Sequence, residues 1–438
     1  MKTSDKLKKY PKKYWLIPLV LFIVPLSVEW LFRDISYQYS ITAIKDLQEW
    51  MNNNGISRAL IPKTYDALSF TNINMFYIIC CVLVYNFLNV YKSFILILSI
   101  FFSNFLSSFL CFIYHCPRPY MVYHGISPYF RLTDWGYPST QIVTMIAFFC
   151  TFYKVIFKSK LIKKKLALKI VIGIFFGLIN IFYIFLHFAG GLITLEQIGL
   201  SIFIGLVVYF TMFSIFEAKV NNAKQFYTIV HFRFIYYLCI NAVMVAFLVI
   251  FHFFIVDQET SDYYISHIDQ QKKEMEKTPG FLSVETIEFF KLSEANFCNV
   301  LCFLSNIFVI IGLKLELYLS YGKNFELWKK SNFENRDGHT GVNYSIYSDH
   351  QYIKGTQWNH TGGCATTMRF FVLIILSAIG YLPSIIIHFS YKVSDPNDNT
   401  QKGLRYAFFI AFPFFYVSFG MFFLFKWVCR KIGLTNKG

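Results

Sequence analysis

Long apolar runs are the feature that most constrains this chain. A helix that crosses the hydrocarbon core of a membrane needs about 20 mostly apolar residues, and the sequence has about ten windows of that kind. Main-chain polar groups in a bilayer must be hydrogen-bonded within the protein, so each window predicts a helix. We therefore expect an all-α, polytopic integral membrane protein. The windows begin near Trp15, Asn74, Ser93, Ser139, Lys169, Leu192, Phe234, Asn296, Met368 and Tyr406.

The composition excludes several other classes of protein. Of the 438 residues, 55% are hydrophobic and only 15% are charged, which is too apolar for a disordered, low-complexity or collagen-like chain. The 10 cysteines lie mostly inside apolar runs without paired C-x-x-C spacing, so we expect no metal, no cofactor and no disulfide framework. The net charge of +16 comes from lysines clustered beside apolar windows. This pattern indicates membrane topology, so we expect membrane lipids and no nucleic acid as partners.

The lysine clusters also predict the orientation. Lysines precede the first window and fill the stretch 158–169, and both regions belong in the cytosol by the positive-inside rule. Ten crossings then leave both termini cytosolic. Segments 33–71, 116–138 and 257–294 and the Gly190–Gly191 turn fall on the opposite face.

Two local patterns refine this picture. Neighbouring windows are separated by only a few residues at Tyr91–Lys92 and at Gly190–Gly191, which predicts antiparallel helix pairs. Apolar residues also recur at helical spacing in the outer segment 33–71. They predict a short helix that either lies on the membrane surface or caps the core of the bundle. These residues are Ile41, Ile44, Leu47, Trp50 and Met51.

Three polar segments fall at the outer ends of the third to sixth windows. In the first, Arg118 lies between Pro117 and Pro119. The prolines restrict the backbone, and the planar guanidinium suits a phosphate group. The alternative is an interfacial arginine whose head group extends to water.

The second segment, 134–141, contains Pro138, Ser139 and Thr140 at a predicted helix start. Main-chain N–H groups there would face an anion, or the residues would simply cap the helix. The third segment joins the fifth and sixth windows and contains His187, Glu196 and Gln197. His187 is either a functional group or a polar residue of the core.

Together the three segments resemble the type 2 phosphatidic acid phosphatase and haloperoxidase superfamily, whose signature is K-x6-R-P, then P-S-G-H, then S-R-x5-H-x3-D. Asp134-Trp-Gly-Tyr-Pro-Ser-Thr is most similar to the "EYGMPSTH" stretch of sphingosine-1-phosphate phosphatases, and Cys116-Pro-Arg-Pro resembles their "WPRP". The resemblance covers about residues 70–215. It implies a six-helix core like that of type 2 phosphatidic acid phosphatases. We expect an anchor span and a non-cytosolic surface segment at 1–70, a phosphatase-like helical core at 71–216 and a four-span extension with long loops at 217–438.

In this family, the lysine and arginines hold the phosphate, the last histidine attacks phosphorus, the P-S-G-H histidine protonates the leaving alcohol and the aspartate orients the nucleophile. The resemblance implies phosphate binding by Arg118, Ser139 and Thr140. It also aligns Cys111 with the lysine and Gln141 with the leaving-group histidine. A thiol is uncharged, and an amide does not donate a proton as an acid, so both roles are lost.

The third motif aligns in two registers. The first places His187 at the arginine, Ile193 at the nucleophile and Gln197 at the aspartate. The second places His187 at the nucleophile, Ile181 at the arginine and Gly191 at the aspartate. We prefer the first, because it best preserves the small residues of the family.

Both registers predict broken catalytic machinery. Loss of a general acid costs about 10²- to 10⁴-fold in rate, and loss of a covalent nucleophile costs on the order of 10⁶-fold. We therefore expect a pseudoenzyme that binds a phosphorylated sphingoid or glycerolipid without turnover. One alternative is an accessory subunit of a larger membrane complex. The other is a divergent active phosphatase with His187 as its catalytic nucleophile.

The resemblance favours the endoplasmic reticulum membrane as the location of the protein. The lysine-rich N-terminus leaves the mitochondrial inner membrane as the alternative.

Overall fold

The computed structural model describes part of the chain, almost all of it as helices, with no β-strand among the residues that it describes. These residues are 16–54, 75–88, 90–114, 116–123, 125–126, 135–157, 165–212, 234–254, 307–309, 311–312, 314–315, 363–380, 382–383, 386, 412, 415–417 and 419–434.

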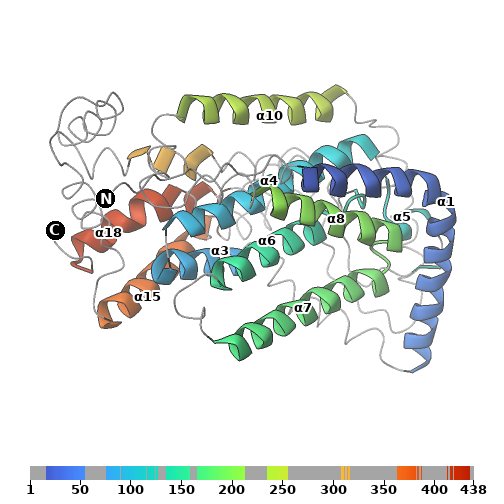
Figure 1. The fold of residues 1–438 in the computed structure, drawn as a ribbon, viewed down its shortest axis with the longest axis horizontal. Helices are drawn as coiled ribbons and strands as arrows, with labels where there is room; N and C mark the ends of the chain where they lie inside the picture. The colour runs from blue at the N-terminus through green and yellow to red at the C-terminus, as the bar shows by residue number, and fades with distance from the viewer. Residues whose placement is uncertain are drawn as a thin grey trace, which may run out of the picture. The chain divides into compact units, whose positions relative to one another are not determined.

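The helices follow one another along the chain as Figure 1 shows. Their bounds are α1 (Leu16–Asn53), α3 (Met75–Leu83), η2 (Val84–Leu88), α4 (Val90–Tyr114), α5 (Pro119–Val122), α6 (Thr140–Phe157), α7 (Leu166–Ala189), α8 (Leu195–Met212), α10 (Phe234–Phe254), α15 (Gly363–Ile379), η6 (Gly420–Leu424) and α18 (Phe425–Lys431). The elements η2 and η6 are short π-helices.

The structure confirms the all-helical class and the apolar character of the chain. Among the described residues, four helices are long and apolar enough to cross a membrane, and they correspond to α4, α6, α7 and α8. Shorter apolar helices lie at Pro18–Val28, Phe234–Ile250 and Cys364–Ile379. Most predicted windows therefore begin within a few residues of a described helix.

Several expectations fall outside the described residues. These are the start of the windows near Asn296 and Tyr406, Asp134 in the second motif, and all of segment 257–294. One boundary differs from the expectation. Tyr91 and Lys92 lie in the first turn of α4, which begins at Val90, so the break after η2 precedes them.

The chain divides into two units by the packing of its backbone. Unit 1 consists of Met1–Met75, Leu98–Lys219 and Met244–Phe303, and unit 2 consists of Phe76–Ile97, Val220–Val243 and Leu304–Gly438. The N-terminal helix packs with the middle of the chain in unit 1, and α4 contributes to both units. The expected division into 1–70, 71–216 and 217–438 stays a prediction.

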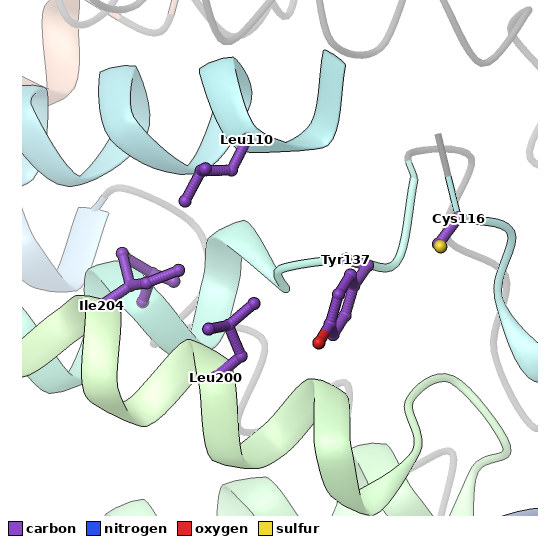
Figure 2. Packing of buried hydrophobic residues seen from close by; sticks show 6 residues of the cluster. Leu110, Cys116, Tyr137, Leu200 and Ile204 are labelled. Atoms are coloured by element: carbon purple, nitrogen blue, oxygen red, sulfur yellow. The ribbon is translucent and has the colours of Figure 1, made fainter. Parts of the chain in front are cut away.

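In unit 1, α8 is the helix on which the others assemble. It packs against α1 and α6, while α7 packs against α6 and α1. An apolar cluster joins α4, α8 and the segment that leads into α6, and Figure 2 shows its side chains. The buried members are Leu110, Cys116, Tyr137, Val143, Leu200 and Ile204. The cluster packs α4, α6 and α8 together.

Helix α1 is a single element of 38 residues, not a span followed by a separate short helix. Figure 1 shows it in blue as two arms that meet at a bend. In its C-terminal half, Ile41, Ile44 and Met51 are buried, whereas Trp50 is exposed. Gln48 is also buried, and its Nε2 donates to the main-chain oxygen of Ala189 at 2.9 Å. This half of α1 therefore caps the core at the α7–α8 turn, which decides between the two alternatives.

In unit 2, α15 packs against η2 and α18. The guanidinium of Arg369 is fully buried, and its Nε donates to Asn86 Oδ1 at 2.7 Å. The Asn86 amide in turn donates to the main-chain oxygen of Thr366 at 3.0 Å. A polar pair thus connects α15 to the π-helical turn η2.

Candidate functional site

The first motif lies in the turn between α4 and α6 and points into unit 1. Arg118 is the N-cap of α5 and has an extended backbone, as expected for a residue that precedes a proline. Its side chain is fully buried, and Nη1 donates to the main-chain oxygen of Leu192 at 3.1 Å. The alternative of an interfacial arginine extended to water is therefore wrong.

The second motif is packed directly against this arginine. Residues 135–140 are all buried. The Gly136 N–H donates to the Cys116 main-chain oxygen at 3.0 Å. A Cβ atom at Gly136 would lie 3.0 Å from Arg118 Cγ and 3.3 Å from Gln197 Oε1. Glycine therefore allows the close approach that brings Arg118 and Gln197 to the same place.

The start of α6 is already hydrogen-bonded within the protein. The Ser139 N–H, which the motif suggested for an anion, donates to Ser201 Oγ at 2.9 Å. Ser201 Oγ also donates to the Gln197 main-chain oxygen at 2.6 Å. This N–H group therefore fixes α6 to α8. The side-chain oxygens Ser139 Oγ, Thr140 Oγ1 and Gln141 Oε1 are buried and have no hydrogen-bond partner in the described part of the chain.

The third motif begins in the last turn of α7. His187 is fully buried, its ring lies 4.5 Å from the ring of Tyr183, and it is within electrostatic range of Arg118. The main-chain oxygen of His187 accepts a hydrogen bond from the Leu192 N–H at 3.0 Å. The turn that contains Leu192 is thus bonded to His187 on one side and to Arg118 on the other.

The residues after this turn build the start of α8. Ile193 is fully buried. Gln197 Oε1 accepts a hydrogen bond from the Thr194 N–H at 3.2 Å. Thr194 and Gln197 have the spacing of a capping box, in which the residue at the third helical position bonds back to the N-cap N–H. At the position of the family's aspartate, the amide therefore serves to cap a helix.

A cluster of hydroxyl groups holds α1 against the same helix start. Ser40 Oγ lies 3.0 Å from Glu196 Oε2 and accepts a hydrogen bond from the Leu195 N–H at 3.1 Å. Ser36 Oγ donates to Glu196 Oε2 at 3.3 Å, and the Thr194 hydroxyl also donates to this carboxylate. Glu196, at the positive end of α8, is thereby fixed by both helices.

At the position aligned with the family's lysine, Cys111 is fully buried in α4. Its Sγ lies 3.2 Å from the Pro138 main-chain oxygen. A thiol is a weak donor without charge, so this contact connects α4 to the start of α6 but adds no positive charge.

The aligned residues of the two registers differ in exposure. His187, Ile193 and Gln197 of the first register are each no more than 2% exposed. Ile181, the arginine position of the second register, is 66% exposed on α7. Gly191, its aspartate position, is buried, has a φ of +68° and forms the turn. The preference for the first register stays a prediction.

The structure brings Arg118 and Gln197 together at Gly136, and His187 lies within electrostatic range of Arg118. Ile193 is buried in the adjoining turn, and Cys111 contacts the main-chain oxygens of Trp135 and Pro138. Sequence reasoning missed Gly136, Ser201 and the Leu192 main-chain oxygen. The T-x-x-Q spacing at Thr194 was a signal for the helix cap that the sequence contained. A hydrogen-bond partner that is a main-chain atom, in contrast, leaves no signal in the sequence.

Among the described residues, no group of three His, Cys, Asp or Glu side chains is placed to hold a metal ion.

No protein-family model matches the chain, and neither a curated protein nor a solved structure matches it. Its function is therefore argued from its own residues.

Proposed function

We propose that the protein is a degenerate membrane protein of the lipid phosphate phosphatase type, nearest in its motifs to sphingosine-1-phosphate phosphatases, which binds a lipid phosphate without hydrolysing it. The proposal includes about ten spans with a six-helix core, cytosolic termini and the endoplasmic reticulum membrane. The observation that supports it best is the fully buried Ile193 at the nucleophile position, beside an aspartate position whose amide caps α8.

The chemistry of these side chains argues against turnover. Transfer of a phosphoryl group to the enzyme needs a nucleophile, and hydrocarbon cannot supply one. Protonation of the leaving alcohol needs an acid, and Gln141 is an amide. Cys111 supplies none of the positive charge that would stabilise the transferred group. Three of the roles in the family mechanism therefore have no side chain to perform them.

The charge that remains supports binding. Arg118 supplies a permanent positive charge with N–H donors in a planar fork, and its Nη1 donates to the Leu192 main-chain oxygen. His187 adds an imidazole within electrostatic range. A lipid phosphate that reaches this region from the outer membrane face would meet these two groups.

The first experiment is inorganic phosphate release by the purified full-length protein from sphingosine-1-phosphate and phosphatidic acid. The wild-type protein, Arg118→Ala and His187→Ala are compared, and folding of each variant is checked by thermal unfolding. We expect no release above the variants. Turnover by the wild type that both substitutions abolish would overturn the proposal and establish a working phosphatase.

Binding is measured with vesicles that contain phosphatidic acid or, as the neutral reference, only phosphatidylcholine. We expect added phosphatidic acid to protect wild-type protein against thermal unfolding and to protect Arg118→Lys less. Lys165→Ala is the matched control, because it removes an exposed lysine at the start of α7. Equal protection of all three proteins would exclude Arg118 as the phosphate ligand.

A further inference from the structure

The proposed phosphate site is closed to ligands in this structure. Arg118 and His187 both have no exposed surface. Water does not reach a side chain that has no exposed surface, and a phosphate group is larger than water. Binding therefore requires a second conformation, in which the segments around these two side chains have moved apart.

The C-terminal arm of α1, residues 36–53, holds one of these segments in place. Gln48 Nε2 donates to the Ala189 main-chain oxygen at 2.9 Å, and both residues are buried. Ala189 is the last residue of α7. The turn that follows it contains Leu192, whose main-chain oxygen accepts the hydrogen bond from Arg118. The arm is thus fastened to the turn that holds the arginine.

The same arm also contacts the segment that carries the arginine, through Tyr123 at the end of α5. Gln38 Nε2 donates to Tyr123 Oη at 3.1 Å, and the rings of Tyr37 and Tyr123 lie 5.9 Å apart. Lys45 Nζ lies 5.9 Å from the centroid of the Tyr123 ring, a distance at which a cation is attracted to an aromatic face. The arm therefore contacts both of the turns that the buried arginine joins.

The two turns also meet each other beside the arm. A Cβ atom at Gly191 would overlap Ile126 Cγ2 and would lie 3.3 Å from Gln48 Nε2. Ile126 and Gln48 are themselves buried. The turn after α7, the segment after α5 and the arm of α1 thus converge on one junction. This junction opens only if the arm moves or if both turns are displaced beneath it.

The arm has the composition of a helix that lies on a membrane surface. Its apolar side chains Ile41, Ile44 and Met51 are buried, whereas the aromatic side chains of Tyr39 and Trp50 are exposed. Tyrosine and tryptophan favour the interface between membrane and water. An amphipathic helix can bury its apolar face at that interface, so lipid would replace the protein contacts of this face. Release of the arm therefore costs mainly its hydrogen bonds.

We propose that the C-terminal arm of α1 is a strap that closes the phosphate site. A lipid phosphate enters only after the arm has left the two turns and lies on the membrane surface. This inference rests on the proposed function, because it describes the regulation of the same site.

The first test measures opening without any phosphate ligand. Cys116, two residues before the arginine, is 8% exposed, and its reaction with a water-soluble maleimide is followed by mass spectrometry on full-length protein in phosphatidylcholine nanodiscs. Gln48→Ala should raise this rate about threefold to tenfold, because one buried hydrogen bond of the closed state is lost. Thr42→Ala is the matched control and should leave the rate unchanged. Thr42 is exposed on the same arm, and its hydroxyl donates to the Gln38 main-chain oxygen at 3.2 Å.

A second cysteine separates local opening from general unfolding. Cys81, in α3 of unit 2, is 1% exposed and lies outside the segments that the strap contacts. Its rate of reaction should be the same in the wild type and in Gln48→Ala.

The second test measures binding of phosphatidic acid by its protection against thermal unfolding. A site that binds only in its open state has an apparent affinity reduced by the open fraction. Gln48→Ala should therefore bind phosphatidic acid about threefold to tenfold more tightly than the wild type, although it lacks a hydrogen bond.

A locked variant tests the same point in the opposite direction. Gln38→Cys combined with Tyr123→Cys is joined by a short thiol crosslinker that a reductant cleaves, which ties the arm to the segment after α5. Crosslinking should abolish phosphatidic acid binding, and reduction should restore it. Gln38→Cys alone, treated in the same way, is the control. Gln38 is exposed and Tyr123 is only half-buried, so this variant keeps the test open if Gln48→Ala does not fold.

The outcomes separate the strap from the phosphate site. Equal Cys116 rates in the wild type and Gln48→Ala would overturn the strap, as would an equal rise at Cys81 or unchanged binding by the crosslinked protein. Faster reaction of Cys116 without phosphatidic acid binding in any variant would instead overturn the proposed function and support the closure.

Discussion

The Nη1 atom of Arg118 donates a hydrogen bond to the main-chain oxygen of Leu192 at 3.1 Å. This bond joins the turn after α4 to the turn between α7 and α8, two segments that are far apart in the sequence. Because the guanidinium is fully buried, the bond is shielded from competing water. Arg118, which the sequence suggested for ligand binding, therefore also joins two turns of unit 1.

The first prediction concerns the stability that this arginine provides. Arg118→Ala should lower the free energy of unfolding by about 2–4 kcal/mol, because it leaves a buried carbonyl without its partner and removes a packed side chain. Unfolding in detergent is followed by the reaction of buried cysteines, such as Cys80 and Cys111, with a thiol dye. Lys165→Ala, which removes an exposed cation, should have almost no effect. A similar loss in both variants would show that Arg118 has no structural role.

The second prediction concerns the turn between α7 and α8. Gly191 has a φ of +68°, and a Cβ atom there would overlap Ile126 Cγ2. Gly191→Ala should therefore destabilise the protein by about 1–3 kcal/mol through backbone strain and steric overlap. Gly177→Ala is the control, because a Cβ at this helical position meets nothing within 4 Å. It should be neutral or stabilise by about 0.5–1 kcal/mol. Midpoint temperatures of unfolding distinguish the two, and equal values would contradict the turn geometry.

The third prediction concerns the attachment of α1 to α8. Ser40→Ala removes the acceptor of the Leu195 N–H and a contact to Glu196, and should cost about 1–2 kcal/mol. Ser27→Ala removes an exposed hydroxyl that bonds only to its own helix at the Ile23 main-chain oxygen. Limited proteolysis should release the N-terminal segment faster in Ser40→Ala than in Ser27→Ala. Identical cleavage rates would argue that the hydroxyl cluster does not hold α1 in place.

The fourth prediction concerns the buried pair Asn86 and Arg369 in unit 2, joined at 2.7 Å. Asn86→Leu should destabilise by about 3–5 kcal/mol, because it leaves a buried charge without this partner. The double variant Asn86→Leu with Arg369→Met should be more stable than Asn86→Leu alone, since an apolar pair needs no hydrogen bonds. A double-mutant cycle on unfolding free energies measures the coupling, and additive effects would mean that the two side chains act independently.

The helical elements were predictable because their signal is local. Apolar windows predicted α6, α8 and α10 to within a few residues, since a span needs a fixed length of apolar side chains wherever it lies. The cap formed by α1 was only half predictable. The spacing of Ile41, Ile44 and Met51 predicted a helix with a buried apolar face. A helix needs such a face whether it packs on the membrane surface or on the protein core, so the sequence left both alternatives open.

The sequence predicted some of the residues of the candidate site but not their hydrogen-bond partners. Arg118 and His187 were identified as chemically unusual residues at span ends, and the structure brings them within electrostatic range. Arg118 is held by the Leu192 main-chain oxygen. Every residue type has such an oxygen, so the sequence gives no signal for this partner. Gln197 was aligned with a catalytic position, yet its oxygen caps α8. A motif therefore indicated which side chains meet, and only packing decided what each one binds.

The sequence by itself determined that this protein is helical and apolar, because hydrophobic length and periodicity are properties of contiguous residues. It also determined which chemical groups are absent, since Ile193 and Gln141 cannot become a nucleophile or an acid in any fold. Only the tertiary structure decided that α1 covers the α7–α8 turn and that Gly136 admits Arg118 beside Gln197. These outcomes depend on distances between residues remote in the chain, and such distances are set by the packing of whole helices.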